Sequence, residues 1–448
     1  MKPERLRLTA FLTALLFAFT GCGEAMVPSV LIQASLPEMP AYPDEQAYID
    51  PVSGVFDSDG FSAVHKAWRD AKTARRQQPE GYTAGTADFT RQTAEAFLTD
   101  TDKNAAVSPL NLYLALGMLA EVTDGESRNQ ILSLLHADSI DTLRSRADSL
   151  WNANYSKDGA LTSVLASSLW LDENLTYKPE PLDRLASVYH ASAFQGQMGD
   201  PAYDAMLQNW INEQTGGLLE EAAGNLSMPP ETILTLATTI FYQAKWKNEF
   251  REENNTERTF HTPTGDVTHT FMRQTDVYGT YYYSETFGAI ARRMEEGGAM
   301  WFILPDEGVS TDTVLTDDAL YELLDPASGW TDCKTLKIHQ YIPKFDISSD
   351  AELGKGLQAL GLTDVFDVKK ADFSPLTDMD AAVSQVKHAV RVAIDEEGVT
   401  AAAFTAMMMA GAARPPEEEM DFILDRPFLF ALTGTDGVIL FMGVVNHP

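Results

Sequence analysis

The chain of 448 residues has very little cysteine, since only Cys22 and Cys333 occur. Two cysteines this far apart, one of them in the N-terminal segment, exclude a disulfide framework in the body of the protein. We interpret Cys333 as a small buried hydrophobe. Basic residues are also scarce: 33 Lys and Arg stand against 65 Asp and Glu, a formal net charge of −32. This acidity argues against nucleic acid and anionic lipid as binding surfaces.

The usual signatures of enzymes are absent as well. The sequence has no G-x-S-x-G, H-E-x-x-H or P-loop motif, and its eight histidines are scattered. We therefore expect no catalytic residues, no metal site and no cofactor, and we predict that the protein is not an enzyme. Paired acids such as Glu295-Glu296 are interpreted as solvated surface, which is the ordinary place for them in so acidic a chain.

The N-terminus has the pattern of an export signal. A basic start, MKPERLR, is followed by an apolar run from Leu8 to Phe19, too short to span a bilayer, and then by Thr20-Gly21-Cys22. This resembles a bacterial lipoprotein signal, cut before a cysteine that is then lipidated. The alternative is an ordinary secretory signal with an incidental cysteine. Both place the body outside the cytoplasm, either lipid-anchored to the bacterial cell membrane or secreted.

Composition divides the chain into three parts. Residues 1–21 are the predicted signal peptide. Residues 22–85 contain six prolines and are interpreted as a membrane-tethering, largely flexible linker with one short helix over Phe61–Arg76. Residues 86–448 form the predicted domain, which we expect to be monomeric.

Within the domain, helical and strand patterns mix. A helix is predicted from Leu110 to Glu121, after Ser108-Pro109, and another from Asp350 to Leu360. The continuous apolar run Thr232–Ala244 is typical of a fully buried strand. Val386 to Ile394 alternates in polarity and predicts a strand with one buried face. Together these patterns indicate an α+β fold.

The stretch Glu396 to Pro416 does not fit this scheme. It is a long apolar connection between two strands, without an amphipathic stripe, and it carries neither charge nor proline between Gly398 and Gly411. Long connections of this kind are often functional.

Several short motifs occur in a fixed order along the domain. They are Asn104 to Leu110, Thr239 to Trp246 with Phe250, Ile342-Pro343-Lys344-Phe345, Leu360 to Phe366, Ala371-Asp372-Phe373-Ser374, Glu396 to Ala403, Arg426 to Phe430 and Phe441 to Pro448. Taken in this order, these motifs resemble those of one family, the serpins. The resemblance covers the whole domain, and six or more weak motifs in the family's order make a strong signal.

The resemblance implies an α+β domain with three β-sheets, about nine helices and an exposed reactive-centre loop. A target protease attacks this loop as a substrate. After acylation, the hinge side of the loop inserts into the main sheet as a new strand and carries the trapped protease with it. The residues that match the family's hinge are Glu396, Glu397, Gly398, Val399, Thr400, Ala401, Ala402 and Ala403.

The loop sequence suits insertion. If Val399 faces inward, alternation turns Ala401, Ala403 and Thr405 inward as well, and these small residues enter a packed sheet without overpacking. The same alternation places Phe404 on the outer face.

Family spacing from the hinge places the reactive bond at Ala412-Ala413. Alternatives are Met409-Ala410 and Arg414-Pro415, although the latter is an imide bond, a poor protease substrate. Small residues suit an extracellular serine protease of elastase or subtilisin type with a small primary pocket. Cysteine proteases are an alternative target class.

By resemblance, Ser108, Asn111, Thr238 and His388 occupy the family's shutter, where the main sheet opens, and Trp246 lies beneath the start of insertion. His388 lies on the apolar face of its strand and needs a hydrogen-bond partner. The alternative for His388 is an ordinary core histidine whose hydrogen bonds are satisfied, and the alternative for Trp246 is an ordinary core aromatic residue.

Two alternatives to protease inhibition remain open. One is a non-inhibitory member of this family that acts as a surface binding or scaffold protein. The other is a simple protease substrate, which the chain would be if Val399 or Thr238 slows insertion. Cleavage without a stable complex would distinguish these from inhibition.

Overall fold

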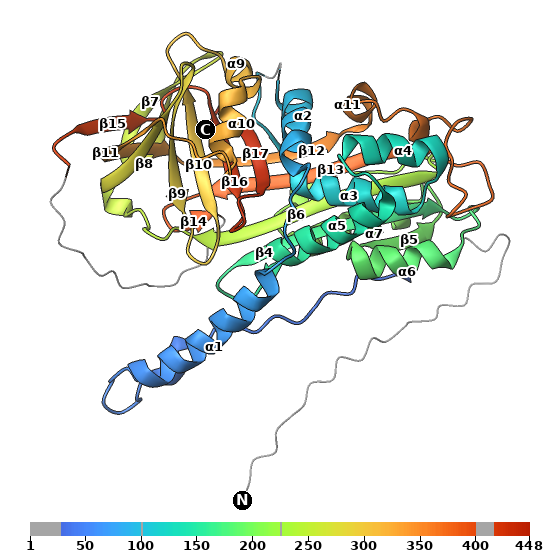
Figure 1. The fold of residues 1–448 in the computed structure, drawn as a ribbon, viewed down its shortest axis with the longest axis horizontal. Helices are drawn as coiled ribbons and strands as arrows, with labels where there is room; N and C mark the ends of the chain where they lie inside the picture. Colours follow the sequence, from blue (N-terminus) through green and yellow to red (C-terminus); the bar gives the residue numbers. More distant parts are fainter. Residues whose placement is uncertain (1–27, 100–101, 225, 400–415) are drawn as a thin grey trace, which may run out of the picture.

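An eight-stranded sheet, the main sheet, runs through the computed structural model, which describes residues 28–99, 102–224, 226–399 and 416–448. Its strand order is β1-β5-β4-β6-β14-β13-β12, with β3 paired to β4 (Figure 1). The strands span β1 Ser29–Ile32, β3 Ser156–Lys157, β4 Thr162–Asp172, β5 Ser192–Gly196, β6 Leu234–Lys245, β12 Phe345–Glu352, β13 Val383–Ile394 and β14 Gly398–Val399.

A second sheet has the order β15-β11-β8-β9-β10-β16-β17-β2, with β7 paired to β8. The resemblance implied three sheets, the main sheet and two smaller ones. Because the long strand β8 pairs with β7, β11 and β9, the two smaller sheets are joined here into a single sheet. The strands are β2 Ala105–Val107, β7 Thr256–Thr262, β8 Gly265–Tyr283, β9 Phe287–Arg293, β10 Ala299–Pro305, β11 Cys333–Pro343, β15 Glu419–Ile423, β16 Phe428–Thr433 and β17 Ile439–Val445.

The helices pack mainly around the main sheet, which confirms the expected α+β architecture. Eleven α-helices occur over the described residues, and the first lies before the domain. They are α1 Ser58–Arg76, α2 Thr86–Leu98, α3 Pro109–Glu121, α4 Gly125–Leu134, α5 Ile140–Asn154, α6 Pro179–Val188, α7 Pro201–Gln214, α8 Glu220–Ala223, α9 Thr311–Leu315, α10 Asp318–Leu324 and α11 Gly354–Ala359.

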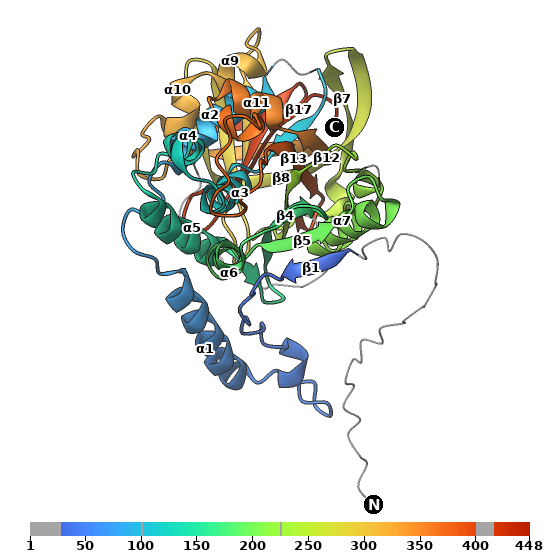
Figure 2. The ribbon, with the colours of Figure 1, turned by 90° about the vertical axis from the view of Figure 1, so that its right-hand side faces the viewer.

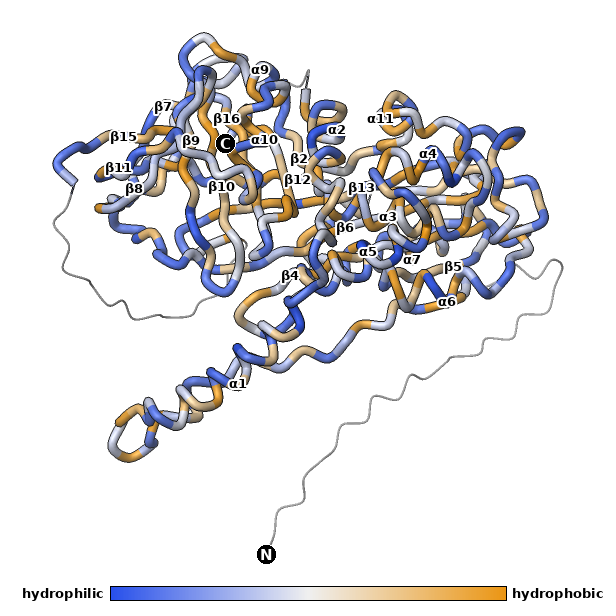
Figure 3. Tube along the Cα trace, viewed as in Figure 1, coloured by the Kyte–Doolittle hydropathy of each residue, from blue (hydrophilic) through white to orange (hydrophobic). Residues whose placement is uncertain are grey.

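Helices α3 and α7 cover opposite faces of the main sheet (Figure 2). Side chains alternate along β4, so Leu165 and Leu169 join the core with α3, whereas Ala166 and Trp170 join the cluster with Trp210 of α7. In Figure 3 hydrophobic residues line the strands, and hydrophilic residues mark many of the outer turns. The main sheet is therefore buried on both faces near its centre.

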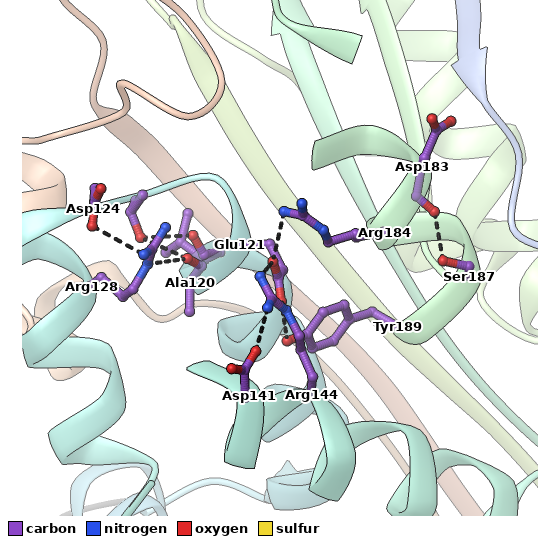
Figure 4. Close-up of polar contacts among 12 residues, drawn as sticks. Ala120, Glu121, Asp124, Arg128, Asp141, Arg144, Asp183, Arg184, Ser187 and Tyr189 are labelled. Atoms are coloured by element: carbon purple, nitrogen blue, oxygen red, sulfur yellow. Dashed lines mark hydrogen bonds and ion pairs between the residues drawn. The ribbon is translucent and has the colours of Figure 1, made fainter. Parts of the chain in front are cut away.

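A buried carboxylate fixes the C-terminal end of α3. Arg144 of α5 donates to both oxygens of Glu121, at 2.7 and 2.8 Å, and the Tyr189 hydroxyl donates at 3.0 Å (Figure 4). The side chain of Glu121 has no exposed surface, and Arg184 of α6 lies 3.8 Å away. Burial, followed by the charge of Glu121, raises the pKa of Tyr189 well above its usual value. This network ties the C-terminal end of α3 to α5 and α6.

Residues 28–85 are not the largely flexible linker that their prolines suggested. Strand β1 extends the main sheet by pairing with β5, and α1 runs outward from the body with Trp68 only 3% exposed (Figures 1 and 2). Lys72 of α1 forms a buried ion pair of 2.8 Å with Asp158. Prolines are compatible with a short edge strand, which the composition alone did not distinguish from a spacer. The predicted helix is present and begins three residues earlier, at Ser58.

Two smaller expectations were wrong. Asp350 to Glu352 belong to β12, where they pair with β13, so the helix expected from Asp350 begins only at Gly354. Cys333 is exposed rather than buried, because it is the first of three exposed residues with which β11 begins. A hairpin turn over Gly434 to Gly437 connects β16 and β17.

Candidate functional site

The candidate site is the seam between β6 and β13 in the main sheet. Along its lower part, from Leu234 to Ile240 of β6, the two strands pair directly and in parallel. Toward the end of β6, the short strand β14 lies between them, and it runs antiparallel to both neighbours. The seam is thus closed along most of its length and already opened at one end by the first residues after Glu397.

Gly398 and Val399 fit this opening closely. A Cβ on Gly398 would lie 2.1 Å from the carbonyl oxygen of Ala244, so only glycine allows β14 to approach β6 here. Val399 is 1% exposed and packs in the core on the α3 side of the sheet. It therefore points inward, which is the orientation that the alternation argument for the loop assumed.

The residues just before β14 are held by backbone contacts. The amides of Trp246 and Phe250 donate to the carbonyl oxygens of Glu397 and Glu396, each at 2.9 Å, and the Trp246 indole donates to the Asp395 carbonyl at 2.8 Å. The Asp395 carboxylate accepts from the amides of Glu397 and Gly398 at 2.9 and 3.1 Å. These bonds form a tight turn from β13 into β14.

An ion pair reinforces this turn. The Glu396 carboxylate lies 2.6 Å from the ammonium group of Lys344, and it also accepts a hydrogen bond from Asn255. Burial alone would raise the pKa of Glu396, but the bonds from Lys344 and Asn255 outweigh it, and the pKa lies below its usual value. The carboxylate is therefore ionised at neutral pH.

The predicted shutter residues meet below this point. The amide of Ser108 donates to Nε2 of His388 at 3.0 Å, and the Ser108 hydroxyl caps α3 by accepting from the Asn111 amide at 3.3 Å. The Asn111 side chain donates to the carbonyl oxygen of Thr239 at 2.6 Å. Thr238 is the residue of β6 that pairs with His388, yet its hydroxyl donates to Ala166, at 3.4 Å.

His388 is buried and neutral. Because its Nε2 accepts a hydrogen bond, the proton of the neutral ring must sit on Nδ1, and Nδ1 has no partner among the described residues. Burial lowers the pKa of His388 to about 4. It thus has one hydrogen-bond partner on the protein and one unsatisfied donor.

Sequence reasoning missed two residues of the site, Lys344 and Asn255. Lys344 lies in the Ile342-Pro343-Lys344-Phe345 motif, where a single cation between apolar residues was the available signal. Asn255 carried no signal, because only the folded chain brings it to Glu396.

Several predicted residues lie outside the described residues. These are Cys22, the hinge residues Thr400 to Ala403, and the candidate reactive-bond residues Met409, Ala412, Ala413 and Arg414. Within the described ranges, no group of three or more His, Cys, Asp or Glu residues is placed to hold a metal ion. No helix in those ranges is both long and apolar enough to cross a membrane.

Comparison with known proteins assigns the family. Residues 84–448 match the family model described as Serpin (serine protease inhibitor), and the chain therefore belongs to the serpins. Proteins of this family are mostly inhibitors of proteases and are generally not enzymes.

Among curated relatives, Serpin-Z1C of Triticum aestivum is 29% identical over 373 residues, covering 77% of this chain and 90% of its own. The leukocyte elastase inhibitor of Homo sapiens is 28% identical over 374 residues, covering 80% and 98%.

Solved structures agree on the fold. The native-state crystal structure of tengpin, a thermophilic serpin, has a TM-score of 0.74 at 24% identity, covering 83% of this chain and 95% of its own. The native stressed conformation of an Arabidopsis serpin gives 0.68 at 24% identity, covering 84% and 98%.

Proposed function

We propose that this protein is a suicide-substrate inhibitor of serine proteases. The observation that carries the proposal is the position of β14, which lies between β6 and β13 and antiparallel to both. A chain that continues from Val399 in the same direction would extend this strand along the seam.

The proposed chemistry starts at the Ala412-Ala413 bond. The catalytic serine of the protease attacks the Ala412 carbonyl carbon, the C–N bond breaks, and a proton passes to the new amine of Ala413. This leaves an ester between Ala412 and the protease. Insertion of residues 398–412 would then carry the ester about 46 Å along the sheet, at roughly 3.3 Å per residue.

The residues of the seam have distinct parts in this proposal. Gly398 lets the first residues enter, and the pair Glu396–Lys344 holds the turn from which insertion proceeds. Below them, the direct pairing of β6 with β13 around His388 and Thr238 must separate for a full strand to enter.

The proposed targets are extracellular proteases with small primary pockets, of elastase or subtilisin type. The alanines at the reactive bond support this, and the human relative named leukocyte elastase inhibitor is consistent with it. We place the protein outside the cytoplasm, anchored to the membrane through lipid on Cys22 or secreted.

The test is incubation of the full mature chain with pancreatic elastase and with subtilisin, followed by denaturing gels and mass spectrometry. We expect a complex that survives denaturant and a C-terminal fragment that begins at Ala413. Cleaved protein alone, with full protease activity retained, would show a substrate or a non-inhibitory member of the family.

A second readout is the melting temperature after loop cleavage. Insertion should raise it by more than about 10 °C, because each kcal/mol shifts a chain of this size by only about 1 °C, but a full inserted strand adds on the order of ten backbone hydrogen bonds at about 1 kcal/mol each. An unchanged melting temperature would exclude insertion.

A further inference from the structure

A buried arginine, Arg292 of β9, lies beneath the hinge end of the seam. Only 7% of its surface is exposed, and Met300, which pairs with it on β10, packs in the same core cluster as Trp246 and Phe250. The guanidinium group lies 3.9 Å from the ring centroid of Phe250 and 5.3 Å from that of Trp246. Arg292 therefore points into the core, against the segment that follows β6.

The guanidinium group makes three hydrogen bonds that join separate parts of the chain. One Nη donates to the side-chain oxygen of Gln340 at 2.6 Å, and the other donates to that of Gln274 at 2.8 Å and to the Asn248 carbonyl oxygen. Gln340 and Gln274 lie opposite each other on β11 and β8. Asn248 belongs to the segment 246–250. Arg292 thus ties two strands of the second sheet to this segment.

The guanidinium group is charged at neutral pH although it is buried. Burial lowers the pKa of Arg292 to about 9, and the negative charge of Asp276 on β8 opposes this lowering. Hydrogen bonds from an ionised donor are stronger than neutral ones, and a planar guanidinium group presents its donors in a fixed fork. A lysine in its place would keep the charge but lose the fork, and an apolar side chain would lose both.

The segment 246–250 holds the N-terminal attachment of the reactive-centre loop. The amides of Trp246 and Phe250 donate to the carbonyl oxygens of Glu397 and Glu396, each at 2.9 Å, in the turn from β13 into β14. In an antiparallel pair, the turn fixes the register of the strand that follows it. This segment therefore sets the register with which the residues after Val399 would enter the seam.

The other side of the contact leads to the C-terminal attachment of the loop. Gln340 of β11 pairs with Phe422 of β15, which is the first described strand after the loop. One buried side chain thus contacts the structures that hold both ends of the loop.

We propose that Arg292 is a positioning residue of the inhibitory reaction, an inference that rests on the proposed function. After acylation two routes compete. Insertion traps the ester, whereas attack by water gives the Ala412 carboxylate and returns the serine hydroxyl of the protease. By holding the turn before β14, Arg292 speeds insertion. It does not affect acylation, because that step takes place in the active site of the protease, which the buried guanidinium group cannot touch.

The test compares Arg292→Met and Arg292→Lys with the wild-type chain, each mixed with pancreatic elastase and with subtilisin. Denaturing gels give the ratio of trapped complex to cleaved, untrapped protein. We expect this ratio to fall by at least about tenfold in Arg292→Met and by about threefold in Arg292→Lys. The rate at which the C-terminal fragment appears should stay unchanged in both variants, which a general loss of structure would not allow.

A milder variant covers the risk that a buried arginine cannot be replaced without misfolding. Gln340→Met cuts only the link to β11 and should lower the ratio by about threefold. The matched control is Gln195→Met, at a buried glutamine of β5 that donates to the carbonyl oxygens of Asp172 and Leu175. It should lower the melting temperature by a similar amount and leave the ratio unchanged. An equal fall of the ratio in Gln195→Met would reduce the role of Arg292 to general stability.

Hydrogen exchange at the amides of Trp246 and Phe250 gives a readout without protease. It should be at least about tenfold faster in Arg292→Met than in wild type, and unchanged in Gln195→Met. Faster exchange in a chain whose wild type traps no protease would contradict the proposed function and support the role of Arg292 in holding the turn. Unchanged exchange, or faster exchange with an unchanged ratio where the wild type does trap protease, would overturn the inference.

Discussion

The two ends of the β6–β13 seam are held by different kinds of contact. At the hinge end, β14 separates the strands, and the turn before it is fixed by an ion pair and by bonds to backbone carbonyl oxygens. At the shutter end, the strands pair directly beneath α3, and buried polar side chains line the joint.

The shutter end is also where hydrogen bonding is incomplete. Four buried side-chain atoms there have no partner among the described residues: Asn111 Oδ1, Thr235 Oγ1, Gln385 Oε1 and His388 Nδ1. Each such atom costs about 1–3 kcal/mol relative to a satisfied one. The closed seam is therefore costly where it is tightest, whereas at the open end an ion pair and backbone hydrogen bonds hold the turn before β14, with Asn255 Oδ1 left without a partner among the described residues.

The largest expected effect is at the hinge end, from Gly398→Val. The new side chain would collide with the Ala244 backbone and keep β14 out of the seam. The fraction of protease trapped in a denaturant-stable complex should fall by at least about tenfold. Ala327→Val, a change in an exposed turn, is the control, and trapping by Gly398→Val at the normal level would refute the role of this opening.

At the shutter end, stability should depend on pH through His388. Its pKa of about 4 in the folded chain lies below the ordinary 6.5, so the unfolded chain binds the proton more readily. The stabilisation is complete above about pH 6.5 and is lost as the pH falls toward 4, by about 3 kcal/mol in total.

Urea unfolding of the intact protein from pH 7 to pH 4 measures this loss. His388→Gln should flatten the profile, whereas His261→Gln, at an exposed histidine, should not. An equal slope in wild type and His388→Gln would mean that other groups cause the acid sensitivity.

Glu396→Gln removes the ion pair with Lys344 and should lower the free energy of unfolding of the intact protein. The loss should be only about 1 kcal/mol, because Lys344 is a third exposed and water screens the pair. The depressed pKa of Glu396 means that its stabilisation is present above its ordinary pKa near 4.5 and is lost as the pH falls further. As the pH falls, the stabilisation from His388 at the shutter end should therefore be lost before the stabilisation from Glu396 at the hinge end. Glu419→Gln, which breaks an exposed pair with Lys337, is the control and should have a smaller effect.

The smallest effects separate two threonines of β6. Thr235→Val removes a buried hydroxyl without a partner and should stabilise the intact protein by about 1 kcal/mol. Thr239→Val removes a hydroxyl that donates to the Ala389 carbonyl at 2.8 Å and should destabilise it by about as much. Urea midpoints that move in the same direction for both variants would contradict the idea of incomplete bonding at this end.

Much of the fold followed from patterns in the sequence, because the strongest elements are long and uniform. The apolar run Thr232–Ala244 predicted β6 to within two residues, and Ser108-Pro109 marked the start of α3. The N-terminal extension was misjudged, because β1 is only four residues long and becomes a strand only against the edge of β5.

The site was predictable only in part. The apolar face of β13 placed His388 in the core, and the inward direction of Val399, which the sequence analysis assumed, is what the structure has. The partners of these residues depend on chain segments far apart in sequence. No local pattern links Asn255 to Glu396, or indicates that Nδ1 of His388 lacks an acceptor.

Strand β1 has a consequence for association between molecules. A sheet edge with free amide and carbonyl groups is a template onto which another chain can add. Here β1 covers the β5 edge of the main sheet, and Pro28 and Pro37 flank β1 closely. Proline has no amide hydrogen to donate, so only a few residues of the new outer edge can form backbone hydrogen bonds with a strand of a neighbouring molecule. The extension thus protects this side of the protein against edge-to-edge aggregation.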